Sequence, residues 1–266
     1  MLGELAGEDG RILAGGQSLV PTMAFRLAKP AHLIDINSIA ALERLAVEDG
    51  RLSIGACVRH AAFHRPAVPG PLGALLAVVV RHIAHYPIRL RGTFCGSLAH
   101  ADPASEWCLV AATLGAEMTA VSTRGTRTIA SADFFAGIMT TALAEDELLA
   151  TARLLLLAAD TRVGFCEFSR RAGDYALAMA LAAFRVEDGI IVAPRLGVGG
   201  AEGSPRRIPE AEAALAGQPP EAAVLRAAAD AAADAIDPLE DIQADAEYRR
   251  DLVRAMTRRA LERACA

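Results

Sequence analysis

Two short glycine-containing stretches hold the residues with the clearest chemical potential in this sequence. Residues 11–18 read Arg-Ile-Leu-Ala-Gly-Gly-Gln-Ser, and residues 91–97 read Arg-Gly-Thr-Phe-Cys-Gly-Ser. Each stretch ends in small or hydroxyl-bearing residues, which lets successive backbone N–H groups face an anion without side chains in the way. The pair therefore predicts two halves of a phosphate clamp, formed by Ala14, Gly15, Gly16, Gln17 and Ser18 and by Thr93, Phe94, Cys95, Gly96 and Ser97.

Neither stretch is a standard nucleotide motif. Gly15-Gly16 lacks the third glycine of the dinucleotide fingerprint, and no Gly-Lys-Ser/Thr sequence follows it, which argues against the usual NAD and ATP sites. A single Gly-Gly also occurs in ordinary tight turns. Two purely structural turns therefore stand as the alternative interpretation.

Other side chains that could do chemistry lack the partners they would need. Ser18 has no neighbouring histidine and no Gly-x-Ser-x-Gly elbow is present, so we predict no catalytic nucleophile. The pairs His60/His64 and His82/His85 have spacings that a metal could use, but no third ligand is evident nearby. We therefore predict ordinary buried or surface histidines and no metal site.

The composition is that of a globular protein without a nucleic-acid surface. The chain has 266 residues, enough for two domains, and a net charge of -5. Its longest apolar run, residues 72–80, is well short of the roughly 18 residues that a membrane-spanning helix needs. The five cysteines include no Cys-x-x-Cys pair and no secretory signal opens the chain, so we expect a cytoplasmic protein that binds no iron–sulfur cluster itself.

An α+β pattern of elements must position the two stretches. Asp49-Gly50 predicts a β-hairpin, and Arg124-Gly125 predicts another. Asp102 is expected to cap a helix that begins at Pro103 and runs to Leu114. The first domain, residues 1–159, is completed by strands at 11–14, 32–36 and 147–157 and helices at 58–63 and 72–83.

The second domain, residues 160–266, is predicted to combine a three-stranded antiparallel sheet with helices. Asp188-Gly189 marks the turn between its last two strands. Alanine-rich sequence with helical periodicity then fills the rest of the chain. The expected strands are 165–170, 176–186 and 190–198, and the expected helices are 209–216, 221–235 and 247–264.

With its flanks, the pattern resembles the FAD-binding medium subunit of molybdenum hydroxylases, of the aerobic carbon monoxide dehydrogenase and xanthine dehydrogenase type. The motifs appear in family order along nearly the whole chain: Leu-Ala-Gly-Gly-Gln-Ser (13–18), His-Leu-Ile-Asp-Ile-Asn (32–37), Arg-Gly-Thr-Phe-Cys-Gly-Ser-Leu-Ala-His-Ala-Asp-Pro (91–103), Phe-Phe-Ala-Gly (134–137) and Arg-Ala-Gly-Asp-Tyr-Ala (171–176). The resemblance implies a two-lobed PCMH-type FAD-binding domain followed by a carbon monoxide dehydrogenase flavoprotein-like domain. It also implies that an opening strand and most of a helix are missing before Met1.

Three further residues receive a role from this resemblance. Glu106 is implied to accept hydrogen bonds from the adenosine ribose, with a solvated first-turn glutamate as the alternative. Leu148 is implied to lie against the adenine or the flavin edge, and Tyr175 to stack on or shield the isoalloxazine. Cys95 departs from the usual glycine, and a side chain there could push the cofactor away and weaken or abolish flavin binding.

The resemblance implies an oxidoreductase subunit that works by electron transfer. Two [2Fe–2S] clusters in a small subunit would pass electrons from a large molybdopterin subunit to FAD in this chain, and FAD would pass them to an external acceptor. A dimer of heterotrimers is the implied assembly, with no catalytic acid or base in this chain. Two alternatives stay open: a stand-alone flavin oxidoreductase, and a non-enzymatic assembly subunit that has lost FAD.

Overall fold

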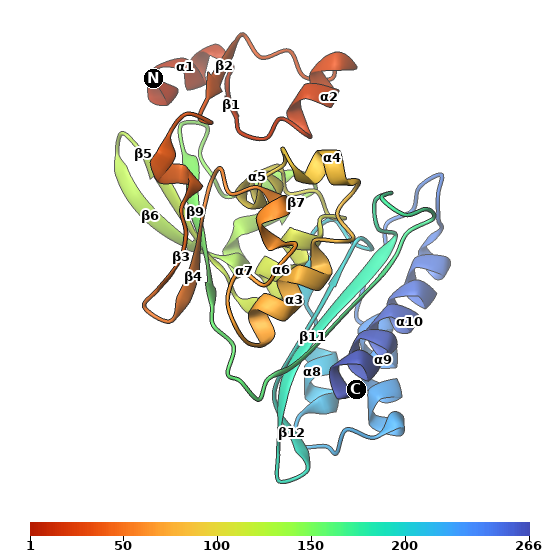
Figure 1. The fold of residues 1–266 in the computed structure, drawn as a ribbon. Helices are drawn as coiled ribbons and strands as arrows, with labels where there is room; N and C mark the ends of the chain where they lie inside the picture. The colour runs from red at the N-terminus through yellow and green to blue at the C-terminus, as the bar shows by residue number, and fades with distance from the viewer.

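The computed structural model of the chain describes residues 1–266 and begins with a small lobe set apart from the rest (Figure 1). Its two strands are parallel, with Gly10 opposite His32 and Leu13 opposite Asp35. The first glycine-containing stretch follows the first of these strands. The elements of the lobe are α1 (Leu2–Leu5), the 3-10 helix η1 (Ala6–Glu8), β1 (Gly10–Leu13), α2 (Leu19–Ala24) and β2 (His32–Asp35).

A five-stranded antiparallel sheet forms the second lobe of the first domain. Its strand order is β3-β4-β9-β5-β6. Both predicted hairpins are present, and Asp49 and Gly50 have the positive φ angles, 50° and 71°, that a tight turn of this kind requires. The strands are β3 (Leu45–Glu48), β4 (Arg51–Gly55), β5 (Glu117–Ser122), β6 (Gly125–Ala130) and β9 (Leu148–Leu155).

Short helices lie between this sheet and the C-terminal domain (Figure 1). The second glycine-containing stretch runs into one of them, α5, whose N-cap residue is Thr93. These elements are η2 (Ala40–Glu43), η3 (His60–Phe63), α3 (Pro71–Val79), α4 (Tyr86–Arg89), α5 (Phe94–His100), α6 (Glu106–Leu114), α7 (Ser131–Phe134), and the small strand pair β7 (Phe135–Gly137) and β8 (Thr140–Thr141).

The predicted start of helix α6 is wrong by three residues. The helix begins at Glu106, and Ser105 is its N-cap residue. Asp102 instead closes a local turn, because its Oδ1 accepts a hydrogen bond from the N–H of Ala104 at 2.8 Å and its carbonyl accepts one from Ser105 at 2.9 Å. An aspartate that bonds to the backbone two residues later favours a turn over a helix.

The C-terminal sheet has four strands in the order β10-β11-β12-β13, one more than expected. Two residues of β13 pair with the end of β12, and the sequence shows no strand signal over so short a segment. Helices α8, α9 and α10 lie on the side of the sheet away from α6 (Figure 1). The elements are β10 (Arg162–Phe168), β11 (Ala178–Glu187), β12 (Ile190–Gly199), β13 (Arg206–Arg207), α8 (Pro209–Leu215), α9 (Ala222–Asp234) and α10 (Ala246–Cys265).

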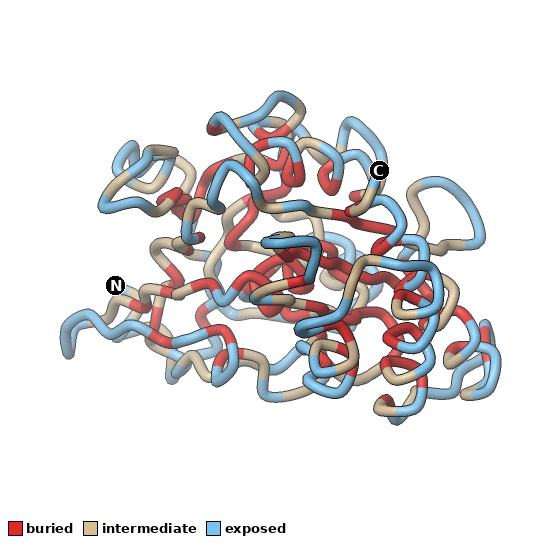
Figure 2. The backbone as a smooth tube through the Cα atoms, turned by 90° about the horizontal axis from the view of Figure 1, so that it is seen from below, coloured by how far each residue is buried: buried red, intermediate tan, exposed pale blue.

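Buried residues are concentrated in the middle of the molecule (Figure 2), and both faces of the C-terminal sheet contribute to them. Successive residues of a strand point to opposite faces. In β11, Met179, Leu181 and Ala183 accordingly join the core of the first domain, whereas Ala178, Ala180 and Ala182 join the core under helices α8–α10. The division into residues 1–159 and 160–266 stays a prediction, since the two cores share this one sheet. No helix in the structure is both long and apolar enough to cross a membrane.

Candidate functional site

The two glycine-containing turns meet at their backbones. A Cβ built on Gly15 would lie 2.6 Å from the Cα of Gly92 and would also overlap the carbonyl oxygen of Arg91. Only a residue without a side chain permits so close an approach. The N–H of His60 donates to the carbonyl of Gly92 at 2.9 Å, so the second turn is hydrogen-bonded to the start of the 3-10 helix η3.

Asn37 and Arg59 connect the two turns through side-chain hydrogen bonds. Asn37 Nδ2 donates to the carbonyl of Ala14 at 2.8 Å, and its Oδ1 accepts from Arg59 Nη2 at 2.6 Å. Arg59 Nη1 donates in turn to the carbonyl of Arg91 at 2.5 Å. One asparagine and one arginine therefore hold the first turn in register with the second.

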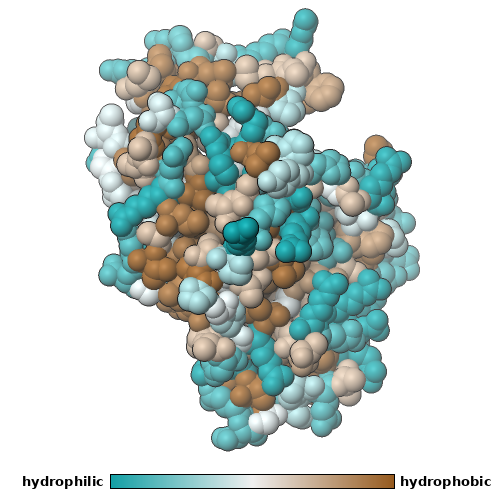
Figure 3. Space-filling view, in the orientation of Figure 1, coloured by the Kyte–Doolittle hydropathy of each residue, from teal (hydrophilic) through white to brown (hydrophobic).

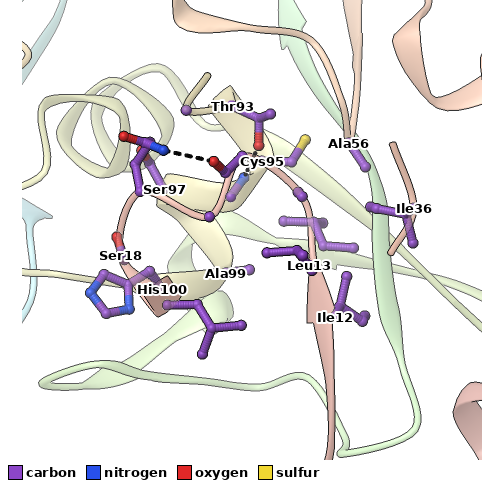
Figure 4. A pocket seen from close by; sticks show the side chains of 18 of the residues that line it. Ile12, Leu13, Ser18, Ile36, Ala56, Thr93, Cys95, Ser97, Ala99 and His100 are labelled. Atoms are coloured by element: carbon purple, nitrogen blue, oxygen red, sulfur yellow. Dashed lines mark hydrogen bonds between the residues drawn. The ribbon is translucent and has the colours of Figure 1, made fainter. Parts of the chain in front are cut away.

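A cavity of about 390 Å³ opens between the turns, below the N-terminal lobe (Figures 3 and 4). Of the predicted site residues, Ala14, Gly15, Gly16, Gln17, Ser18, Thr93, Cys95, Gly96, Ser97 and Leu148 line it. Apolar side chains from β1, from β9 and from the segment after β2 form much of its wall, among them Ile12, Ile36 and Leu149. This mixed apolar and polar lining suits a ligand that has both an apolar and a polar part.

Phe94 is the one predicted residue of the second turn that does not line the cavity. It is fully buried and packs against Phe63 and Trp107, with ring centroids 5.7 Å and 4.9 Å away. A large apolar ring gains more from this core than from a polar cavity. Phe94 was predicted only as part of the backbone of the turn, and its N–H donates to the carbonyl of Val58 at 3.1 Å, so this amide is not free to bind an anion.

Cys95 does not obstruct the cavity in the way its replacement of glycine suggested. Its φ angle is not positive, and its thiol donates to the carbonyl of Ile54 at 3.4 Å, within the apolar core. Figure 4 shows the sulfur turned toward Ala56. Burial raises the pKa of the Cys95 thiol to about 12, so the group carries no negative charge toward an anion.

A second cavity of about 190 Å³ adjoins the first, because Gln17, Ser18, His60, Ser97 and His100 line both. It lies between the first domain and the loop that joins β10 to β11. Glu106 reaches it from the start of α6, and Tyr175 reaches it from that loop. Tyr175 is 67 % exposed, so its ring is not held by the core.

Glu106 is not a solvated glutamate, which was the alternative interpretation of this residue. It is only 9 % exposed. Its pKa is raised to about 7, chiefly by burial and also by the nearby Asp102, while Arg89 acts in the opposite direction. A carboxyl group with this pKa changes its protonation state near neutral pH, and it does so in the wall of the second cavity.

Two family models match this chain. Residues 2–154 match the model described as "FAD binding domain in molybdopterin dehydrogenase", and residues 164–264 match the model described as "CO dehydrogenase flavoprotein C-terminal domain". The chain belongs to the molybdopterin dehydrogenase FAD-binding family. It is an FAD-binding oxidoreductase subunit, as its motifs predicted.

Relatives of this flavoprotein subunit match over nearly its whole length. The nicotine 6-hydroxylase medium subunit of Paenarthrobacter nicotinovorans is 41 % identical over 96 % of this chain and 89 % of its own. Carbon monoxide dehydrogenase from Hydrogenophaga pseudoflava superposes with a TM-score of 0.94 at 34 % identity, covering 98 % of this chain and 92 % of that one. Quinoline 2-oxidoreductase from Pseudomonas putida 86 superposes with a TM-score of 0.91 at 35 % identity, with the same coverage.

The two turns of this FAD-family subunit have backbone donors to offer to a pyrophosphate. The N–H groups of residues 15–19, and those of Thr93 and Cys95, donate to no acceptor within the protein. The hydroxyl of Thr93 is already engaged as a helix cap, since it accepts from the N–H of Gly96 at 3.0 Å. Adjacent free amides in a partly buried cradle suit an anion such as a pyrophosphate.

Asn37, Arg59 and His60 belong to the site although their contributions do not follow from the sequence. Asn37 stands within a family motif, but its partner Arg59 lies on a different segment. His60 was predicted to be an ordinary buried or surface histidine, and its hydrogen-bond partner is Trp107, 47 residues further along the chain. Only the folded chain brings these pairs together.

Proposed function

We propose that this chain holds FAD across the two adjoining cavities and transfers electrons as the medium subunit of a heterotrimeric molybdenum hydroxylase. A small subunit with [2Fe–2S] clusters would deliver electrons that a large molybdopterin subunit removes from the substrate. An external acceptor would then receive them from FAD. The family membership supports this role, and the names of the relatives, which include a medium subunit and a medium chain, support the three-subunit organisation.

The cavities suggest how this chain would orient FAD. The adenosine end would lie in the larger cavity, beside Leu148 and the strand β9. The pyrophosphate would lie between the two turns, against the free amides of residues 15–19, Thr93 and Cys95. The isoalloxazine would lie in the smaller cavity, with Tyr175 free to cover it. Glu106 lines only this smaller cavity, so the orientation proposed here places it at the edge of the flavin and replaces the contact with the adenosine ribose that the resemblance implied.

When bound, FAD supplies the ability to accept electrons singly and to release them in pairs. The protein contributes position and environment. Glu106 can hold a proton in the wall of the smaller cavity near neutral pH. No residue in the site has the arrangement of a substrate nucleophile, so oxidation of the substrate is left to the large subunit.

One observation carries the proposal: the two turns converge until Gly15 and Gly92 touch, and the amides around that contact have no partner in the protein. Turns with a purely structural role are not expected to leave adjacent backbone donors unpaired around a shared cavity, because unpaired buried donors lower the stability of the fold.

The test is a visible spectrum and a metal analysis of the protein, produced and purified together with the proteins that the neighbouring genes encode. We expect one flavin per chain, together with iron and molybdenum in the same particle. A protein that stays colourless after incubation with FAD would be the assembly subunit that has lost the cofactor. Stoichiometric flavin with neither metal, and turnover by the chain alone, would indicate the stand-alone oxidoreductase.

The proposed assembly is a cytoplasmic dimer of heterotrimers. Native mass spectrometry of the purified particle measures this directly, since each subunit stoichiometry has its own mass. A particle containing one copy of each subunit would contradict the dimer while leaving the electron-transfer role intact.

A further inference from the structure

His60 lies where the two cavities adjoin, and it is one of the few residues that line both. It is the first residue of the 3-10 helix η3, and only 4 % of its surface is exposed. A polar side chain this deeply buried normally has all its hydrogen bonds satisfied inside the protein. In His60 only one of the two ring nitrogens has such a partner.

Trp107 fixes which nitrogen of His60 carries the proton. The indole Nε1–H of Trp107 donates to His60 Nδ1 at 2.9 Å. An indole nitrogen can only donate, so Nδ1 must accept, and the proton of the neutral imidazole is on Nε2. Trp107 is itself held by Phe63 and Phe94, with ring centroids 5.2 Å and 4.9 Å away, so the orientation is set by the core.

His60 stays neutral at every physiological pH. Its pKa is lowered to about 3, chiefly by burial and also by the guanidinium groups of Arg59 and Arg89. No carboxylate is among the groups that act on the pKa of this ring. The imidazole therefore presents one fixed N–H donor whose availability does not depend on pH.

The Nε2 of His60 has no acceptor in the protein. It lies against Gly92, where a Cβ would come within 2.5 Å of it, and so stands directly beside the second turn. The backbone N–H of His60 also binds the carbonyl of Gly92, which couples the histidine to the same turn. Because His60 lines both cavities and its Nε2 is not among the fully buried unpaired atoms, this N–H is open to a ligand acceptor in the cavity.

We propose that His60 is a cofactor-binding residue whose Nε2–H donates to the pyrophosphate of FAD, with Trp107 as the positioning residue that fixes its tautomer. The inference rests on the proposed FAD site and adds a side-chain donor to the backbone amides. We assign the contact to the pyrophosphate because His60 adjoins Gly92 and Thr93. These residues belong to the turn whose free amides would bind the pyrophosphate.

Two substitutions separate this role from a structural one. The amide of asparagine reaches only the position of Nδ1, so His60→Asn can still accept from Trp107 but offers no donor to the cofactor. The amide of glutamine reaches the position of Nε2, so His60→Gln keeps the donor and loses the bond to Trp107. A cofactor contact predicts that the asparagine variant binds more weakly, whereas a structural role predicts that the glutamine variant is the more damaged.

The measurement is the dissociation constant of the full-length chain for FAD, for ADP and for riboflavin. Binding is detected by the change in fluorescence of Trp107, the only tryptophan. We expect His60→Asn to weaken binding of FAD and ADP about tenfold, and His60→Gln to stay within about threefold of the unmodified chain. Riboflavin, which has no pyrophosphate, should bind all three proteins equally.

Several results would overturn the proposal. Equal loss in the two variants, or a larger loss in His60→Gln, would leave His60 with a structural role alone. Unchanged ADP binding in His60→Asn would exclude the pyrophosphate contact. Nitrogen NMR of the unmodified chain gives an independent check: a protonated Nδ1 would contradict the tautomer. An unmodified chain that binds no FAD would instead refute the proposed function itself.

Discussion

Gly15 and Gly92 pack directly against each other, since a Cβ on Gly15 would lie 2.6 Å from the Cα of Gly92. The two residues belong to different lobes of the first domain, so this contact seats the N-terminal lobe on the rest of the molecule. Neither turn could form the cavity without the other.

Substitution of Gly15 by alanine should separate the two turns. The added methyl group would meet the backbone of Arg91 and Gly92, which cannot move aside as a flexible side chain can. We expect a loss of about 1–3 kcal/mol in the free energy of unfolding and FAD affinity at least tenfold lower. Gly7→Ala is the matched control, because a Cβ at Gly7 meets nothing within 4 Å. Equal behaviour of the two variants would refute the close contact.

Removal of the Asn37 side chain should loosen the same contact without adding any bulk. Asn37→Ala leaves the carbonyl of Ala14 and the guanidinium of Arg59 without their partner. We expect about 1–3 kcal/mol of destabilisation and weaker FAD binding, both measured by urea titration with and without FAD. Gln243→Ala serves as the control, because Gln243 is exposed and its side chain makes no hydrogen bond. Unchanged FAD affinity in Asn37→Ala would show that the turns hold each other unaided.

Glu147 should stabilise the fold except in acid. Arg127 donates to both of its carboxylate oxygens, at 2.7 Å and 2.8 Å, and this pairing lowers the pKa of Glu147 to about 2. The contribution is present above the ordinary pKa of 4.5 and is lost as the pH falls through 2. Glu147→Gln should therefore cost about 1–3 kcal/mol at pH 7 and less at pH 3, in thermal unfolding. Glu145→Gln, an exposed position two residues away, should change neither value.

Glu167 should have the opposite dependence on pH. Its side chain is 2 % exposed, and its Oε2 has no hydrogen-bond partner although His82 Nδ1 is 3.7 Å away. Burial raises its pKa to about 9, and the charge of Glu106 adds to this effect. Its contribution to stability is full below pH 4.5 and is lost as the pH rises through 9.

Glu167→Gln should consequently flatten the fall of stability in alkali. At pH 9 we expect the variant to be more stable than the unmodified chain by about 1–3 kcal/mol, with a smaller difference at pH 5, in urea titrations at the two pH values. Glu240→Gln is the control, since Glu240 is exposed and forms no ion pair. A variant less stable than the unmodified chain at pH 9 would show that the charged carboxylate is favourable.

The elements marked by local signals could be predicted from the sequence. Asp49-Gly50 and Asp188-Gly189 formed their turns with positive φ at both residues, because that chemistry depends on neighbouring residues alone. The start of α6 was predicted wrongly for a related reason: Asp102 has two local partners available, and the turn prevailed over the cap.

The residues that line the cavity could be predicted from the sequence only where the backbone faces the cavity. Gly15, Gly16 and Gly96 could be recognised because glycine has a backbone meaning. Phe94 could not be assigned, since its direction depends on Phe63 and Trp107. The same holds for His60, whose role appears only once Trp107 is in place.

Helix α6 has consequences for any attempt to dissect the molecule. All of its residues from Glu106 to Leu114 are buried, and Arg195 of β12 donates to the carbonyl of Leu114 at 2.7 Å. A fragment ending near residue 159 would lack the C-terminal sheet that packs on one side of this helix, so the apolar surface of that side would be exposed to water. We therefore expect such a fragment to aggregate when expressed by itself, and the two halves to be recovered in soluble form only when they are produced together.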